Sequence, residues 1–198
     1  MHVPGRDKSE AESELKMDEI EVGMGIHNED GSERTTSDLP GLVQKMLKYM
    51  LDPSDKDRAF LSISGSNETV VLVNNLGGVS ALEMGGITNE VLEQLEKTYG
   101  IKPSRILSGT YMTSLNGLGF SISLLKLTDT GSSKSMLELL DAPAEANGWS
   151  AAVSAETWKQ RSSATREVSE AQGVEEKPSG LTCKSSTLGS TIDPTDLT

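Results

Sequence analysis

The stretch "ETVVLVNNLGGVS", residues 68–80, decides the fold of this 198-residue chain. It opens with a continuous apolar run, which is typical of a strand buried on both faces and so indicates parallel-sheet character. "NNLGGVS" then ends the strand and leads into a helix expected over residues 79–99 and closed by Gly100. Gly85 and Gly86 interrupt the apolar stripe of that helix, so we expect it to be broken or bent there.

The flanking sequence predicts further elements of the same sheet. Asp38 is a good N-cap and Pro40 falls in the first turn of an amphipathic helix that ends before Pro53. The turn formers of "NEDGSERTTSD" predict a loop before that helix. The resulting order βαββαββα indicates an α/β fold (an α+β sandwich), in which helices cover a mixed sheet. The remaining expected elements are strands at 20–27, 58–64, 103–114 and 119–128 and a closing helix at 135–143.

Apolar residues make up 35% of the chain and gather between about residues 38 and 143, so the core belongs to the middle. We therefore expect four segments. They are a polar lead-in at 1–18, a folded domain at 19–148, a linker at 149–172 with a surface helix around Trp158, and a disordered tail at 173–198.

The net charge of −12 excludes two classes of partner. Residues 1–38 hold eleven acids against four basic residues, and such a surface repels nucleic acid and anionic membranes. The start lacks the apolar region of a secretory signal, and no run approaches the ~20 apolar residues that cross a bilayer. We expect a soluble, cytoplasmic protein. A single cysteine, Cys183, excludes an intramolecular disulfide and offers no zinc cluster.

His27 is a candidate site residue because Gly23, Gly25 and Gly31 flank it and permit close approach of a ligand to the backbone. On these features alone an incidental or structural histidine is the stronger interpretation. The adjacent acids Glu29 and Asp30 could orient the imidazole or simply be solvated. His2 lies too near the terminus to act as its partner, so a two-histidine metal site has no support.

Two glycine-rich turns each admit two interpretations. Gly77 and Gly78 could cradle a phosphate at a helix N-terminus, but a tight strand-to-helix turn is favoured. For the loop at 114–119 (Ser114, Asn116, Gly117 and Gly119), a turn is likewise the favoured interpretation and a ligand-binding loop is the alternative. Neither G-x-G-x-x-G nor G-x-x-x-x-G-K-[ST] occurs between a strand and a helix, so no nucleotide site is indicated.

Ordered blocks of the sequence carry a resemblance to a known family. Together they resemble the second half of the substrate-binding domain of dihydroxyacetone (glycerone) kinases, closest to the ATP-dependent fungal-type enzymes, over about residues 2–170. The blocks are "DEIEVGMGIHNEDG" (18–31), "DKDRAFL" (55–61), "VLVNNLGGVSALE" (71–83), "IKPSRILSGTYMTSLNGLGFSISLLKL" (101–127) and "SMLELLDAPAEANGW" (135–149).

The resemblance implies a specific role for His27. In the family the histidine of this block attacks the ketone carbon of dihydroxyacetone and holds it as a covalent hemiaminal, so His27 would be both the catalytic anchor and the substrate-binding residue. A neutral imidazole is a competent nucleophile near physiological pH. The bound triose is then phosphorylated by ATP to dihydroxyacetone phosphate. Asp30 stands where the family usually has proline, which puts the rigidity of the turn in doubt.

The same resemblance implies missing parts. ATP and Mg²⁺ are the family's cofactors, and we expect the domain that binds them, and the half-domain that supplies the aspartate base, to lie outside this chain. The leading hypothesis is therefore a dihydroxyacetone kinase fragment that is inactive alone. The alternative is a non-catalytic triose-binding or regulatory module that forms a homodimer or pairs with a full-length kinase.

Overall fold

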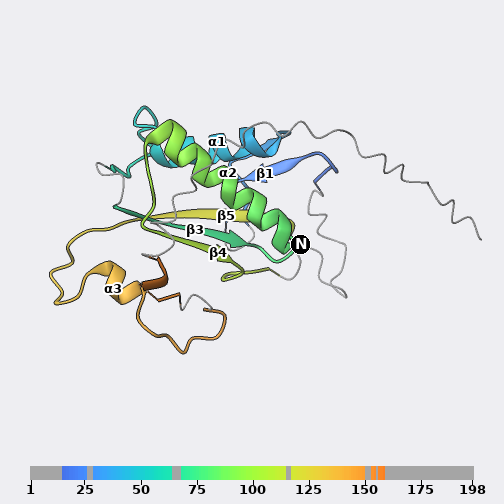
Figure 1. Cartoon of the computed structure of the whole chain (residues 1–198). Coiled ribbons are helices and arrows are strands. Elements are labelled where there is room, and N and C mark those ends of the chain that lie inside the picture. The colour runs from blue at the N-terminus through green and yellow to red at the C-terminus, as the bar shows by residue number, and fades with distance from the viewer. Residues whose placement is uncertain are drawn as a thin grey trace, which may run out of the picture. The chain divides into compact units, whose positions relative to one another are not determined.

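The computed structural model describes residues 15–25, 29–63, 68–114, 117–149, 153–154 and 156–158. The strand β3 (Thr69–Asn75) is the centre of a three-stranded sheet of order β4-β3-β5. It pairs in parallel with β4 (Arg105–Gly109) and antiparallel with β5 (Phe120–Lys126), as Figure 1 shows. All residues of β3 except Leu72 are buried, because the strand has a neighbour on each side and a layer on each face. The expected α/β class with a mixed sheet is confirmed.

The helices α1 (Leu39–Leu51) and α2 (Ala81–Tyr99) cover one face of this sheet. Val71 and Val73 point from β3 into the layer between sheet and helices and are fully buried. Alternate residues of β5 complete the same face, since Leu124 pairs with Val71 and Ile122 with Val73. The helices contribute the buried side chains Val43, Leu47, Met84, Ile87, Val91 and Leu95.

The helix ends follow the sequence signals. The Asp38 carboxylate accepts a hydrogen bond from the Gly41 amide at 3.0 Å, as expected of an N-cap. Ser80 and Glu83 form a reciprocal capping box at the start of α2, and Gly100 ends it with φ +66°. The expected break at Gly85 and Gly86 is wrong, because α2 runs unbroken from Ala81 to Tyr99. Two glycines cost roughly 2 kcal/mol of helix propensity, and the buried side chains on both sides of the pair offset it.

A separate hairpin joins β1 (Ile20–Val22) to β2 (Glu33–Thr35) in antiparallel register. β2 lies inside the stretch predicted to be a loop, while residues 58–63 of the strand predicted at 58–64 contain no strand. The observed order is therefore ββαβαββα rather than βαββαββα. The apolar residues of "RAFLSIS" predicted a strand that residues 58–63 do not form. Phe60 is 90% exposed, and the Ala59 amide donates to the Asp55 carbonyl in a turn.

The second face of the sheet is covered by the segment that follows β5. Val70 and Leu107 point to this face and are buried. The short helix α3 (Met136–Leu140) lies on this side in Figure 1, and Asp141 at its end is paired with Arg105 of β4. Residues 156–158 are helical, while the predicted lead-in up to residue 14 and the predicted tail at 173–198 lie outside the described residues.

Candidate functional site

The loop at 23–32, which carries the predicted site residue, closes the β1–β2 hairpin. Val22 and Glu33 are the last paired residues before it. The Ser32 amide donates to the Val22 carbonyl at 2.8 Å, and the Gly25 amide donates to the Glu29 carbonyl at 3.3 Å. Residues 26–28, which include His27, fall between Gly25 and Glu29 and lie outside the described residues. The role of His27 therefore stays a prediction.

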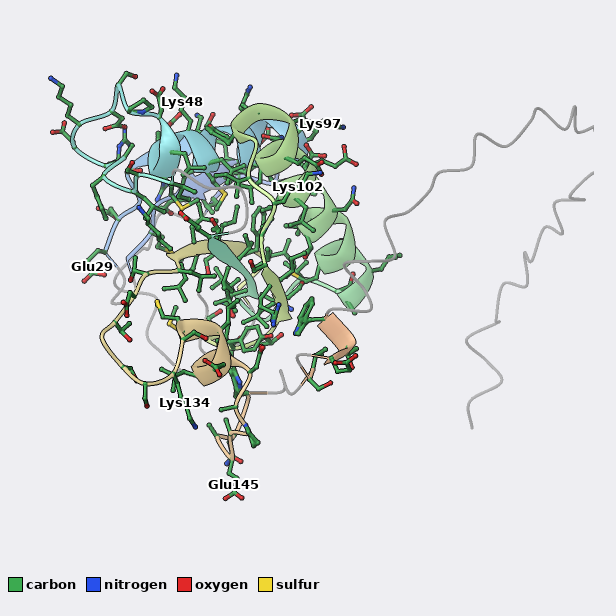
Figure 2. All side chains as sticks on the ribbon, turned by 60° about the vertical axis from the view of Figure 1, so that its left-hand side comes forward. Glu29, Lys48, Lys97, Lys102, Lys134 and Glu145 are labelled. Carbon is green, nitrogen blue, oxygen red and sulfur yellow. The ribbon has the colours of Figure 1, made fainter. Side chains whose placement is uncertain are left out.

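The glycines of this loop have different structural reasons. Gly23 has φ +78°, a left-handed conformation that other residues adopt at a cost. Gly31 is pressed against the hairpin, since a Cβ there would lie 2.9 Å from the Val22 carbonyl oxygen and would also meet the Glu21 side chain. The atoms nearest to a Cβ on Gly25 would be those of the flexible Glu29 side chain. Gly23 and Gly31 therefore set the shape of the loop limbs, and Glu29 and Asp30 are exposed on it; Figure 2 shows Glu29 pointing outward.

Two carboxylates that the sequence analysis missed hold this hairpin. Oε1 of Glu21 accepts the Gly31 amide at 2.7 Å, while its Oε2 lies 3.6 Å from the Arg34 guanidinium. Glu33 faces α1 instead, accepting from Lys45 Nζ at 2.5 Å and from the Tyr49 hydroxyl at 2.8 Å. The sequence carries no local signal for Glu33, because Lys45 and Tyr49, which share one face of α1 at i, i+4 spacing, lie 12 and 16 residues away from it.

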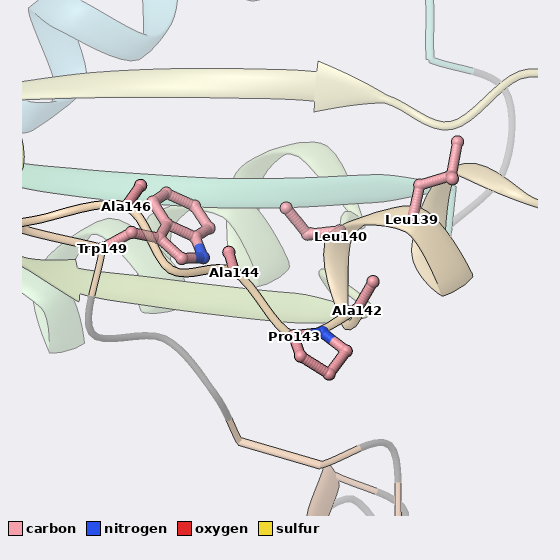
Figure 3. A pocket seen from close by; sticks show the side chains of 7 residues that line it. All are labelled: Leu139, Leu140, Ala142, Pro143, Ala144, Ala146 and Trp149. Carbon is pink, nitrogen blue, oxygen red and sulfur yellow. The ribbon is translucent and has the colours of Figure 1, made fainter.

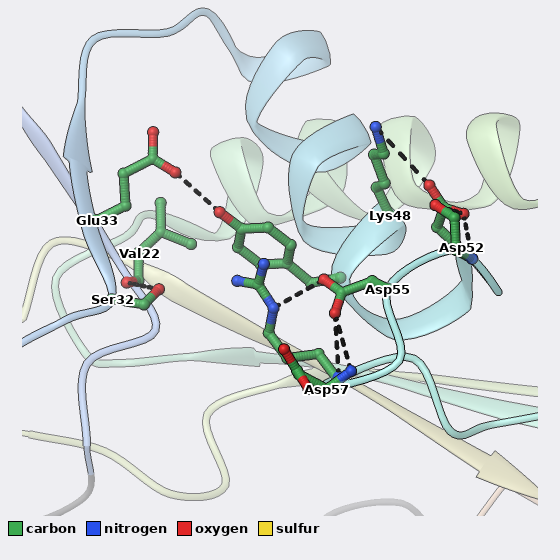
Figure 4. A network of polar contacts seen from close by, with 10 residues as sticks. Val22, Ser32, Glu33, Lys48, Asp52, Asp55 and Asp57 are labelled. Atoms are coloured by element: carbon green, nitrogen blue, oxygen red, sulfur yellow. Dashed lines mark hydrogen bonds and ion pairs between the residues drawn. The ribbon is translucent and has the colours of Figure 1, made fainter.

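Figure 4 shows part of this network, with one of the two hydrogen bonds of Glu33 and those of Asp55 as dashed lines. Hydrogen bonds from Lys45 and then from Tyr49 hold the pKa of the Glu33 carboxyl below its ordinary value. The Arg58 guanidinium lies over the Tyr49 ring at 3.8 Å and is itself bound by Asp55 at 2.8 Å. This chain of contacts joins β2, α1 and the "DKDRAFL" segment.

The strand-to-helix turn after β3 is a closed turn rather than an anion cradle. The Asn75 side chain accepts from the Gly77 and Val79 amides at 2.8 and 3.2 Å. The Gly78 amide donates to the Gly117 carbonyl at 2.9 Å, and Glu83 takes the Ser80 amide. Because these amides are already bonded within the chain, the phosphate interpretation is not supported and the tight turn is.

Asn74, the neighbour of Asn75 in β3, binds the backbone of the segment that follows β4. Its Oδ1 accepts from the Tyr111 and Met112 amides at 2.9 and 3.0 Å, and its Nδ2 donates to the Met112 carbonyl at 2.7 Å. Hydrogen bonds also hold Ser114 and Gly117. The Ser114 amide donates to the Leu76 carbonyl, and the Gly117 amide donates to Ser114 Oγ. The described residues of the 114–119 loop thus serve as a turn; Asn116 lies outside them.

An apolar groove of about 350 Å³ lies under the sheet (Figure 3). Its lining is the end of α3 and the segment after it, with Trp149 tilted against the Tyr111 ring at 5.2 Å between centroids. No charged side chain lines it, so it offers little to a small polyhydroxylated ligand. The lining residues are Leu139, Leu140, Ala142, Pro143, Ala144, Ala146 and Trp149.

Neither a metal centre nor a nucleotide site is built by the part of the chain that the structure describes. No three histidine, cysteine or acidic side chains gather there as a metal-binding group. In the same residues, no helix is long and apolar enough to cross a bilayer. The charged side chains labelled in Figure 2, such as Lys97, Lys102 and Glu145, point outward from the fold.

Comparison with known proteins identifies the family. The model of the Dak1 domain matches residues 1–148. The chain belongs to the Dak1 domain family. The predicted resemblance to dihydroxyacetone kinases is therefore confirmed. The residues that match the Dak1 domain include both the β1–β2 hairpin and the three-stranded sheet.

Curated Dak1 relatives include two fungal dihydroxyacetone kinases. The Pichia angusta protein is 44% identical over 170 residues, which cover 81% of this chain and 28% of the relative. The Komagataella pastoris protein is 48% identical over 143 residues, or 71% of this chain and 23% of the relative. Human triokinase/FMN cyclase is 36% identical over 74% of this chain and 24% of its own length. The chain thus spans about a quarter of the length of the curated relatives it matches.

Solved structures agree on the fold. A structure described as the dihydroxyacetone kinase operon co-activator Dha-DhaQ has a TM-score of 0.52 at 24% identity, over 71% of this chain and 38% of that chain. A second, titled regulation of the dha operon of Lactococcus lactis, has a TM-score of 0.53 at 25% identity over 67% of this chain and 38% of that chain. The Dak1 fold therefore occurs in proteins with different descriptions.

Proposed function

We propose that the chain supplies the substrate-anchoring part of an ATP-dependent dihydroxyacetone kinase, with His27 as the covalent anchor. The observation that carries the proposal is the 44% identity to a dihydroxyacetone kinase over a stretch that includes most of this chain. The described limbs of the His27 loop support it through two glycines that a larger residue replaces only with strain, Gly23 at φ +78° and Gly31 against the Val22 carbonyl oxygen.

The anchoring step is an addition to a carbonyl. A ring nitrogen of neutral His27 donates its lone pair to C2 of dihydroxyacetone, and the π pair of the carbonyl moves to oxygen. That oxygen takes a proton while the other ring nitrogen releases one, so the product is a neutral hemiaminal. Glycerol has no carbonyl and cannot form this bond, which makes the step selective.

ATP and Mg²⁺ enter the proposal only as what the family uses to phosphorylate the anchored triose. The described residues do not fit them, because the amides of the turn before α2 (residues 77–80) are bonded to Asn75, Gly117 and Glu83, and the described residues contain no metal-binding group of side chains. We therefore assign nucleotide and metal binding to residues outside the described part of the fold.

A carbon NMR titration with dihydroxyacetone labelled at C2 tests the anchor. The expected result is loss of the carbonyl signal and growth of a tetrahedral carbon signal in the parent chain, with no such change for His27→Ala. His2→Ala is a matched control, since it removes the chain's other histidine and keeps His27. An adduct that survives His27→Ala but not His2→Ala would sink the proposal, as would a parent chain that forms none.

Turnover is a separate question with its own assay. A coupled assay of the purified chain with ATP and Mg²⁺ is expected to show no phosphorylation of dihydroxyacetone, because the side chains and amides of the described residues do not form a site for either cofactor. ATP-dependent turnover by this chain alone would contradict the assignment of cofactor binding to other residues.

A second candidate function is a non-catalytic triose sensor that forms a homodimer or binds an intact kinase. The observation in its favour is the likeness to the structure titled regulation of the dha operon, at 25% identity. Sedimentation of the chain with and without an intact fungal dihydroxyacetone kinase distinguishes the two candidates. A stable complex whose formation depends on dihydroxyacetone favours the sensor, and a chain that sediments as a monomer both with and without the kinase rejects it.

A further inference from the structure

We propose that Lys45 and Tyr49 of α1 position the two described limbs (23–25 and 29–32) of the loop that carries His27 by holding the carboxylate of Glu33, an inference that rests on the proposed function of His27. Glu33 pairs with Val22 in the hairpin, and these two residues are the root of the loop at 23–32. A displacement of Glu33 relative to α1 therefore moves both limbs of the loop together.

Both oxygens of Glu33 are occupied from one helix. Oε1 takes Lys45 Nζ at 2.5 Å and Oε2 takes the Tyr49 hydroxyl at 2.8 Å, so the carboxylate is fixed in plane as well as in position. The helix is a firm support, because Val43 and Leu47 between and beside these residues are fully buried in the core. The two donors thus connect the hairpin to a helix whose inner face lies in the hydrophobic core.

Tyr49 is itself held by Arg58 of the "DKDRAFL" segment. The Arg58 guanidinium covers its ring at 3.8 Å, and Asp55 orients Arg58 through a 2.8 Å ion pair and accepts the Arg58 amide at 3.2 Å. The charges of Glu33 and Asp55 balance those of Lys45 and Arg58. The family-like block "DKDRAFL", which the anchoring chemistry leaves without a role, becomes the outer support of the loop.

Positioning rather than global stability is the expected contribution. The side chains of Lys45 and Glu33 are 29% and 37% exposed, and ion pairs this exposed contribute little to the free energy of unfolding. A reacting nitrogen, by contrast, must be held to within a fraction of an ångström of its productive position. Loss of the support should therefore loosen the loop and weaken the adduct while the core stays folded.

Lys45→Met tests this against the matched control Lys48→Met on the same helix, whose ammonium pairs with Asp52 at 3.7 Å rather than with the hairpin. In the ligand-free chain, nitrogen relaxation of the Gly25 and Gly31 amides should show increased motion for Lys45→Met and none for Lys48→Met. The hemiaminal should form roughly tenfold less favourably with Lys45→Met. Lys45→Arg, which keeps a charged donor, should restore both measurements, and the urea midpoint should stay within error for all three variants.

The outcomes separate this inference from the proposed function. Unchanged loop relaxation in Lys45→Met overturns the positioning role whether or not an adduct forms, and so does an equal effect of Lys48→Met. A fall in the urea midpoint that parallels the loss of adduct also overturns it, since the residues would then act through stability. A loosened loop in a chain that never forms an adduct supports the positioning contacts and rejects the anchor.

Discussion

Arg105 of β4 and Asp141, which follows α3, form a two-pronged ion pair. Arg105 Nε lies 3.0 Å from Oδ1 and Nη2 lies 2.7 Å from Oδ2, and each side chain is only 13% exposed. The guanidinium also donates to the Ser104 carbonyl at 2.6 Å and lies 5.5 Å from the Trp158 ring. This pair fastens the segment after β5 across the second face of the sheet.

Asp141→Asn should therefore destabilise the chain. The change leaves the largely buried Arg105 without its counter-charge, which costs about 2–3 kcal/mol. Urea unfolding followed by circular dichroism measures the loss. Glu93→Gln is the control, since it breaks an exposed i, i+4 pair with Lys97, and its midpoint should not move. Equal midpoints for the two variants would show that the Arg105 pair does not fasten the segment.

Replacing single glycines by alanine should have opposite effects at two positions. Gly31→Ala places a Cβ 2.9 Å from the Val22 carbonyl oxygen, which must shift, and should cost about 2 kcal/mol. Gly86→Ala meets no atom within 4 Å in an exposed part of α2 and should stabilise by about 0.5–1 kcal/mol through helix propensity. Thermal unfolding of both variants checks the signs. Stabilisation by Gly31→Ala would mean that the loop limb is not packed as described.

The titration of Glu33 should report its contacts with α1. Its pKa is lowered mainly by Lys45 and next by Tyr49, so its contribution to folding is present above the ordinary glutamate pKa and is lost as the pH falls through the lowered value. Carbon NMR of the Glu33 carboxyl should show a rise of the pKa toward the ordinary value in Lys45→Met and a smaller rise in Tyr49→Phe. A pKa that stays put in Lys45→Met would contradict the 2.5 Å ion pair.

Asn74→Ala should disorder the chain after β4 as well as destabilise it. Asn74 is 2% exposed, and its loss leaves the Tyr111 and Met112 amides without their acceptor, at about 3 kcal/mol in total. Hydrogen exchange should become faster at these two amides before any change in β3. Asn89→Ala, at an exposed position of α2, is the control and should stay within about 0.5 kcal/mol of the parent.

The parts of the fold that the sequence predicts are those whose signal is local. The apolar run of β3 and the caps Asp38, Ser80 and Gly100 lie within a few residues of the structure they produce. β2 was missed because "ERT" is a charged tripeptide that is a strand only through its pairing with β1. Residues 58–63 show the reverse case, since their apolar letters have no sheet neighbour there and Phe60 is exposed.

In the candidate site, too, residues with a local signal can be predicted from the sequence and residues with distant partners cannot. The glycines around His27 are visible in the sequence, because glycine itself is the signal for a tight backbone. Glu33 and Asn74 are not, since their roles depend on partners at positions 45, 49 and 112 that only folding brings near. Acidic and amide side chains are too common for their letters alone to mark such contacts.

The central place of β3 has a consequence for synthesis on the ribosome. Both of its sheet neighbours come later in the chain, β4 after α2 and β5 only when Lys126 has emerged. The β3-α2-β4 unit can close first, since α2 connects its two parallel strands. Until then both edges of β3, the most buried of the described strands, are unpaired, and afterwards one edge stays unpaired until β5 is synthesised. A nascent chain stalled before residue 120 is therefore the form of this protein most exposed to chaperones and to aggregation.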